Sequence, residues 1–199
     1  MNNKIKNITV YSVLIAIMVI MAFTPLGYIR TPNGGVEITL MAIPVIVGIS
    51  LLGMKGGLVL GAVFGITSLI QCFGMSVFGA TLLSINPIFT VITCLVPRLL
   101  MGLIAGGIND LMNKKKCKKA LTYAVTSVLT PLLNTVFFVA FLMLLFGQSE
   151  YILSLQTEMG TTGIWAFIIA KFGVNAGLEI ALCLVAGTAI CKAVEKVKR

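Results

Sequence analysis

The stretch VEITLMAIPVIVGISLLGMKGGLVLGAVFGI (Val36–Ile66) decides the fold class of this chain. It holds two long apolar runs, and Lys55 is the cation that separates them. A run of about 20 apolar residues is long enough to cross the hydrocarbon core of a bilayer as a helix. The whole chain has the same character, with 58% hydrophobic residues, 11% charged residues and a mean hydropathy of +1.07. Soluble domains are less apolar and more charged, so the sequence predicts an all-α integral membrane protein.

Outward from this stretch, similar runs recur along all 199 residues and predict one membrane-embedded domain (1–199), a compact bundle of six transmembrane helices. The expected helices are 7–23, 37–53, 56–73, 87–108, 120–146 and 163–191. Twelve of the fifteen Lys and Arg residues lie in alternate gaps between these runs. Because cytoplasmic loops of membrane proteins are rich in Lys and Arg, we expect both termini to be cytoplasmic.

The charge and the reactive residues exclude several classes of function. The net charge of +9 is concentrated at short loop edges, where membrane topology and anionic lipids account for it without a nucleic acid partner. The chain has no His, and its five Cys residues form no ligand or disulfide pattern, so neither a metal nor a cofactor is expected. No catalytic constellation or nucleotide-binding motif is present, which argues against an enzyme.

Glycines at four-residue spacing mark tight packing between helices. They occur in three of the expected helices as Gly53, Gly57, Gly61 and Gly65, as Gly102 and Gly106, and as Gly173 and Gly177. Small residues one turn apart let two membrane helices approach closely. The pattern predicts a closely packed bundle rather than a wide pore.

Two ionisable residues are expected in the inner half of the bundle. At about 1.5 Å per residue, Arg98 lies roughly 17 Å below the outer end of its helix, and Glu179 roughly 24 Å below the outer end of the last helix. Buried charges in a membrane are costly unless they pair or line a cavity. We therefore expect Arg98 and Glu179 to form a structural ion pair.

A third cation, Lys171, is expected in the outer half of the last helix. Asn175 and Glu179 follow it at four-residue steps, which places the three on one helical face. Lys171 and Asn175 could bind a ligand, although Lys171 could instead extend to the outer membrane surface.

Further amide and aromatic residues are expected near the same depth and complete a candidate substrate site: Asn134, Gln71, Asn86, Phe138 and Trp165. A concave site of this kind suits a small polar ligand with one apolar side. Two residues have structural alternatives. Asn86 precedes Pro87 and could cap a helix, and Asn134 could form a hydrogen bond between helices.

Two further features lie near the N-terminus. Ser12 and Ala16 are small residues one turn apart, which would allow close packing within the bundle or against a second protein. The loop from Thr24 to Val36 is rich in Pro and Gly and could be a lid over an outer pocket or a passive connector.

Together with Ile85–Ile108 and Leu129–Val139, the opening stretch resembles the substrate-binding S components of energy-coupling factor (ECF) vitamin transporters. The resemblance implies a membrane subunit that captures a vitamin from outside. It also implies a complex with a transmembrane coupling subunit and two cytoplasmic ATPases, in a prokaryotic plasma membrane. The family docks through an Ala-x-x-x-Ala pattern on its first helix, matched here by Ser12 and Ala16.

Three motifs look most like the pantothenate-type members: QCFG (Gln71–Gly74), INP (Ile85–Pro87) and PLLNT (Pro131–Thr135). Lys171 could hold a carboxylate, while amide side chains could bond an amide and hydroxyls. Riboflavin is the rival substrate, but a flavin calls for more aromatic surface than one Trp and four Tyr offer. A self-sufficient secondary transporter or channel is the alternative of a different class, but no inverted repeat is evident.

Overall fold

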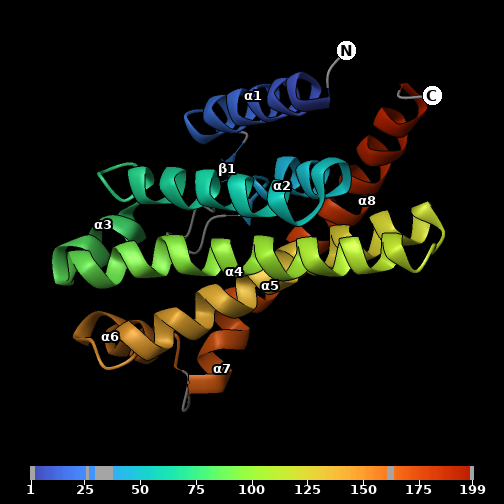
Figure 1. Ribbon diagram of the computed structural model, residues 1–199. Coiled ribbons are helices and arrows are strands. Elements are labelled where there is room, and N and C mark those ends of the chain that lie inside the picture. Colours follow the sequence, from blue (N-terminus) through green and yellow to red (C-terminus); the bar gives the residue numbers. More distant parts are fainter. Residues whose placement is uncertain (1–2, 26, 30–37, 161–163, 198–199) are drawn as a thin grey trace.

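The computed structural model describes residues 3–25, 27–29, 38–160 and 164–197, and nearly all of these are helical (Figure 1). In chain order the elements are α1 (Asn3–Ala22), β1 (Tyr28–Ile29), β2 (Ile38–Thr39), α2 (Ala42–Gln71), α3 (Val77–Ile85), α4 (Pro87–Lys114), α5 (Lys119–Phe146), α6 (Glu150–Glu158), α7 (Ile164–Ile168), the π-helical turn η1 (Ile169–Gly173) and α8 (Val174–Val197). Within these ranges, five helices are long and apolar enough to cross a membrane: α1, α2, α4, α5 and α8. The expected all-helical membrane class is confirmed.

Helix α2 reverses direction at Gly53. This residue has φ 67° and ψ −150°, a conformation that glycine adopts without steric cost. A side chain at Gly56 would collide with the carbonyl oxygen of Gly48, although eight residues of straight helix would separate them by about 12 Å. The legs 42–52 and 54–71 therefore pack against each other. Asp110 of α4 caps the second leg, because its Oδ2 accepts a hydrogen bond from the Met54 amide at 3.0 Å.

The second leg of α2 packs on α4 through backbone contacts that only glycine permits. A side chain at Gly102 would meet the carbonyl oxygen of Gly57, and one at Gly61 would meet that of Arg98. The predicted close packing of these glycines is confirmed. The same prediction is wrong for Gly173 and Gly177, which are exposed. No described atom lies within 4 Å of where a Cβ of Gly177 would be.

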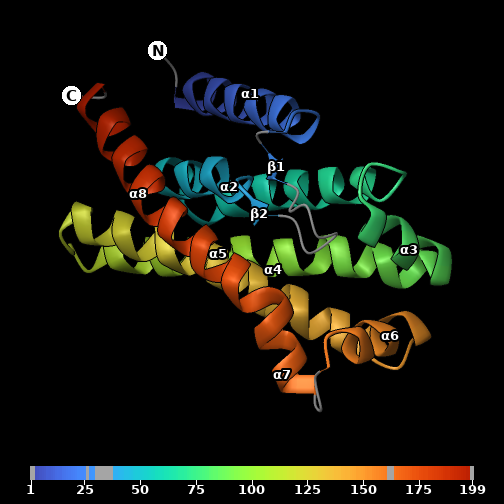
Figure 2. The same cartoon turned by 180° about the vertical axis from the view of Figure 1, so that it is seen from behind.

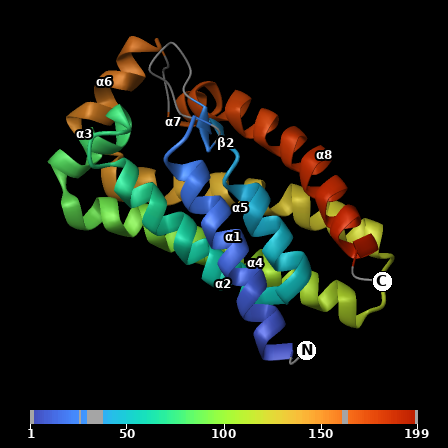
Figure 3. The same ribbon diagram turned by 90° about the horizontal axis from the view of Figure 1, so that it is seen from above.

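The two ends of the bundle differ in character. One end, here named the lysine end, holds the Lys114–Lys119 segment, the Gly53 turn, the start of α1 and the end of α8 (Figure 3). At this end an ion pair of 2.7 Å joins Lys119 to Glu195 and so fastens α5 to α8. The opposite end, the short-helix end, carries α3, α6 and α7 (Figure 2).

Several expected boundaries are wrong. The helix expected at 37–53 begins at Ala42, because β2 pairs antiparallel with β1 just before it. The segments expected to connect helices at 74–86 and 147–162 contain the short helices α3 and α6, which begin after the N-caps Ser76 and Ser149. The helix expected at 163–191 is divided by η1, where five residues take the wider π-helical winding.

Apolar side chains gather in two clusters and also cover much of the surface. The first cluster joins α1, both legs of α2, and parts of α4, α5 and α8. The second lies at the short-helix end, between α3, α5, α6 and the segment α7–η1. Many large apolar residues are exposed, among them Ile8 and Ile20 on α1. A surface of this kind suits contact with lipid or with another membrane subunit.

Candidate ligand-binding site

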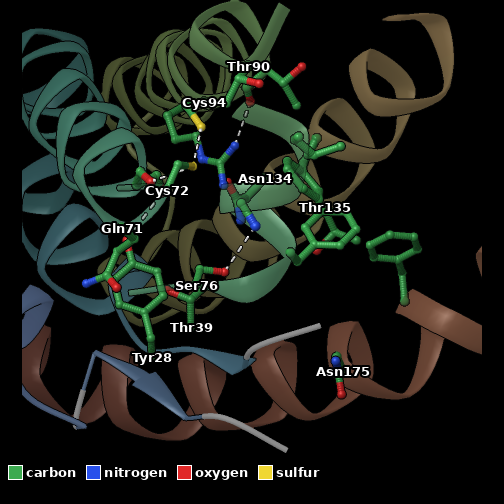
Figure 4. A pocket seen from close by; sticks show the side chains of 18 of the residues that line it. Tyr28, Thr39, Gln71, Cys72, Ser76, Thr90, Cys94, Asn134, Thr135 and Asn175 are labelled. Carbon is green, nitrogen blue, oxygen red and sulfur yellow. Dashed lines mark hydrogen bonds between the residues drawn. The ribbon is translucent and has the colours of Figure 1, made fainter. Parts of the chain in front are cut away.

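A cavity lies on the short-helix side of the bundle, between side chains from eight elements: β1, β2, α2, α3, α4, α5, η1 and α8 (Figure 4). The space open to the centres of water molecules measures about 120 Å³. Its polar lining residues are Tyr28, Thr39, Ser68, Gln71, Cys72, Ser76, Thr90, Thr93, Cys94, Arg98, Asn134, Thr135, Asn175 and Glu179. Phe78, Leu82, Phe138 and Phe172 supply an apolar wall from the second cluster. A concave site with one apolar wall and several convergent polar groups is the usual form of a small-molecule site.

Arg98 supplies the positive charge of the cavity from the middle of α4. Its side chain is 8% exposed, and its Nη1 donates a hydrogen bond to the carbonyl oxygen of Thr93 at 2.8 Å. The guanidinium carbon lies 4.9 Å from the ring centroid of Phe138 and 5.4 Å from that of Phe64, a cation–π arrangement that stabilises the buried charge. Its buried Nε has no acceptor within the described part of the chain. A guanidinium has five N–H donors, so most of this donor capacity is open to an anionic ligand.

Glu179 supplies a carboxylate from α8. It is 5% exposed, and its Oε1 accepts a hydrogen bond from the Thr39 amide of β2 at 2.7 Å. The predicted ion pair with Arg98 is wrong, since no N–O contact within 4.0 Å joins these two described residues. The prediction compared only the depths of Arg98 and Glu179 along their helices. It could not anticipate that a backbone amide of β2 would donate a hydrogen bond to Glu179. Arg98 and Glu179 therefore line one cavity without a direct contact.

Two buried amide side chains in the cavity wall lack part of their hydrogen bonding. Asn134 of α5 is 5% exposed, and its Oδ1 has no partner in the described structure. Gln71 at the end of α2 donates through Nε2 to the carbonyl oxygen of Ala22, whereas its buried Oε1 has no described partner. Buried polar groups are nearly always hydrogen-bonded, so a ligand that offers N–H or O–H groups would complete this site.

Hydroxyl groups occupy the rest of the wall. Thr90 and Thr93 of α4 donate to the carbonyl oxygens of Asn86 and Phe89, at 2.9 and 2.8 Å, which leaves their own oxygens able to accept. The Tyr28 hydroxyl lies 3.3 Å from the Ser68 hydroxyl. Burial raises the pKa of Tyr28 above its usual value, so this phenol stays neutral and keeps its proton at physiological pH.

The structure places four of the seven residues predicted to bind substrate in the cavity: Gln71, Asn134, Phe138 and Asn175. Asn86 and Trp165 are elsewhere. Asn86 caps α4 by accepting a hydrogen bond from the Phe89 amide at 3.1 Å, and Trp165 is 76% exposed. The side chain of Lys171 lies outside the described residues, and so do Leu26 and residues 30–36 of the expected lid.

The expectation that Lys171 shares a helical face with Asn175 and Glu179 assumed an α-helix throughout, and the backbone around Lys171 is different. Lys171 belongs to η1, where the winding is wider than in an α-helix. The four-residue spacing of an α-helix therefore applies to Asn175 and Glu179 but not to the step from Lys171. Those two residues do follow each other within α8, and both line the cavity.

Sequence reasoning missed several lining residues, chiefly Tyr28, Thr39, Cys72, Cys94 and Phe172. Arg98 and Glu179 were expected only as an internal pair. One signal was available: Thr90, Cys94 and Arg98 recur at four-residue steps and so share a face of their helix. For β1 and β2 no comparable signal was available, because strands of two residues leave no periodic pattern.

The predicted docking residues lie on the surface. Ser12 and Ala16 are both exposed on α1, while Leu14 and Met18 of the same helix are buried in the first cluster. The Ser12 hydroxyl donates to the carbonyl oxygen of Ile8 at 3.0 Å, so its polarity is satisfied within the helix. Ser12 and Ala16 therefore form a small-residue patch on the exposed side of α1.

Comparisons with known proteins agree with this description. Residues 6–190 match the family described as the substrate-specific component of ECF transporters. The chain is also 32% identical over 142 residues to the pantothenate transporter PanT of Leuconostoc mesenteroides, an alignment that covers 68% of this chain and 67% of that protein. The chain therefore belongs to the family of substrate-specific components of ECF transporters.

Proposed function

We propose that this protein is the pantothenate-binding subunit of an ATP-driven ECF importer. Membership of the family supports the role of a membrane subunit that selects the substrate of a transporter. The similarity to a pantothenate transporter supports the choice of vitamin. The proposal rests mainly on one structural observation, the cavity into which a buried guanidinium and two incompletely bonded amides converge.

The chemistry of pantothenate fits these groups. Its carboxylate would bind the open N–H groups of Arg98, because charge-assisted hydrogen bonds between guanidinium and carboxylate are strong and directional. Its amide N–H and two hydroxyls would bond to the oxygens of Asn134 and Gln71 that lack protein donors. Its geminal methyl groups would pack on the wall formed by Phe138 and Phe172.

Lys171 remains a second candidate for the residue that binds the carboxylate of pantothenate. A lysine ammonium offers a point charge on a flexible stem, whereas arginine offers a planar fork of donors. Arg98 is the stronger candidate because it lines the cavity and is fixed between two aromatic rings. Variants of the two residues separate these assignments.

For the topology, we propose six membrane crossings, with the two legs of α2 counted separately. The lysine end would face the cytoplasm, because cationic loops prefer that side, and the cavity would then open outward from a prokaryotic plasma membrane. Import would require a transmembrane coupling subunit and two ATPases, which supply the energy for release inside. The exposed face around Ser12 and Ala16 would dock on the coupling subunit.

Isothermal titration of the purified chain in detergent tests this function. Pantothenate should bind at one site per chain, and riboflavin should not bind at the same concentrations. Uptake into vesicles should need the coupling subunit and the ATPases. Riboflavin binding in place of pantothenate would contradict the substrate, and strong accumulation by the chain alone would contradict the importer mechanism.

A further inference from the structure

Two thiols face each other in the wall of the cavity. Cys72 follows the last residue of α2, and Cys94 lies in α4, 22 residues further along the chain. Their Sγ atoms are 3.8 Å apart (Figure 4). Both residues are buried, and both line the cavity. Neither cysteine is in a disulfide.

The surroundings of Cys72 allow the small movement that a bond between these sulfurs needs. A disulfide has an S–S distance of about 2.05 Å, so the two atoms would have to approach by somewhat less than about 2 Å. Cys94 is held within a long helix, but Cys72 stands where α2 gives way to the turn 72–75. Gly74 of this turn has φ 98°, and Phe73 is 70% exposed. The amides of Met75 and Ser76 donate to the carbonyl oxygen of Gln71, so a shift of Cys72 carries Gln71 with it.

A bond between these sulfurs would join the two segments that carry polar groups of the site. Cys94 precedes Arg98 by one helical turn on the same face, and Cys72 follows Gln71 directly. Gly79 of α3 packs closely on Cys72, since a Cβ there would lie 2.7 Å from the sulfur. Drawing Cys72 toward α4 would therefore move Gln71 and narrow the cavity.

We propose that Cys72 and Cys94 are a reversible thiol–disulfide pair, and that its oxidation weakens ligand binding in the cavity. The proposal rests on the ligand-binding function of this cavity. The oxidant is a small organic disulfide. One cysteine thiolate attacks it, forms a mixed disulfide and releases the first small thiol, and the second cysteine then displaces the other small thiol. Two S–H bonds are lost and one S–S bond forms in the protein, while two electrons and two protons pass to the small thiols.

The first test asks whether the bond forms, and it uses no vitamin. The full chain in detergent is treated with hydroxyethyl disulfide, denatured and labelled with a maleimide. The oxidised protein should carry two labels fewer than the reduced protein, and mass spectrometry after proteolysis should identify the linked Cys72 and Cys94 peptides. Cys117→Ser, which changes a thiol at the lysine end, should still form the bond. Absence of the linked peptide from the wild-type protein would overturn the proposal whatever the protein binds.

The second test asks what the bond does to the site. Pantothenate affinity should fall at least about tenfold on oxidation, which corresponds to about 1.4 kcal/mol, and dithiothreitol should restore it. The double variant Cys72→Ser/Cys94→Ser, which leaves neither thiol to form a mixed disulfide, should bind pantothenate equally before and after treatment. Cys72→Ala/Cys94→Ala gives the same comparison if this variant does not fold. If the reduced and the crosslinked wild-type proteins bind pantothenate with equal affinity, the proposal that the disulfide weakens ligand binding is wrong. A reduced protein that does not bind pantothenate would instead contradict the proposed substrate, and the linked peptide would still decide whether the thiols pair.

Discussion

The guanidinium carbon of Arg98 lies 4.9 Å from the ring centroid of Phe138, so a buried cation and an aromatic face share one wall of the cavity. The ring stabilises the charge without using its N–H donors. A guanidinium held in this way is positioned before a ligand arrives, and little rotamer entropy remains to be lost on binding. Four experiments test what this arrangement and its surroundings do.

Replacing Arg98 by Gln should weaken pantothenate binding by about 10- to 100-fold, the range expected for loss of a charged hydrogen bond. Arg98→Lys should recover only part of the affinity, because a point charge does not reproduce the planar fork. Isothermal titration measures both. The matched control is the alcohol analogue of pantothenate, which lacks the carboxylate and should lose little affinity. Equal losses for acid and alcohol would mean that Arg98 stabilises the fold rather than the ligand.

Lys171→Ala separates the two candidates for the carboxylate. If Lys171 holds it, as the sequence predicts, this variant should lose far more affinity for pantothenate than for the neutral alcohol. If Arg98 holds it, Lys171→Ala should change both affinities by less than about threefold. The same titrations on both variants decide between the residues, and similar losses for acid and alcohol would remove Lys171 from the site.

Ala16→Trp should block transport while it leaves ligand binding intact, because a bulky ring on the exposed face of α1 prevents close approach of a second helix. Binding is measured on the isolated chain, and uptake in cells that also produce the coupling subunit and the ATPases. Ile17→Trp is the matched control, since Ile17 is also exposed but lies about 100° around the helix from Ala16. Loss of binding in Ala16→Trp, or loss of uptake in both variants, would argue against a docking role for this face.

Gly102→Ala should lower the melting temperature of the purified chain by about 3–10 °C, as expected for a clash in a packed interior. The added methyl group would meet the carbonyl oxygen of Gly57 in α2. Gly177→Ala is the control, because the space around Gly177 is open and alanine favours the helix. A thermal unfolding curve followed by circular dichroism compares the two. A melting temperature of Gly102→Ala at or above the wild-type value would contradict the tight packing of α2 on α4.

The long helices were predictable from the sequence, because the length and hydropathy of an apolar run are enough to identify a membrane-spanning helix. The reversal of α2 was also visible in part, since Lys55 and a row of glycines separate two apolar runs. The short helices α3 and α6 were missed because each has only nine residues, too few for a spanning pattern. The turn η1 was missed because π-helical winding has no strong sequence signal.

Of the polar residues in the cavity wall, only those with amide side chains were predicted from the sequence to bind the ligand. Asn134, Asn175 and Gln71 stand out as polar residues in apolar runs, and all three line the cavity. The errors at Arg98 and Glu179 came from comparing depths alone, which ignores rotation about the helix axes and neighbours from distant segments such as Thr39. Asn86 and Trp165 show the same limit, because a polar or aromatic residue near the right depth can cap a helix or face outward instead.

The most direct measurement is the identity of the small molecule that co-purifies with the wild-type chain from cells grown with pantothenate. Mass spectrometry of the denatured protein should detect pantothenate at close to one molecule per chain from the wild type, and much less from Arg98→Gln. A different vitamin, or the same amount of pantothenate from both proteins, would contradict the account of this cavity.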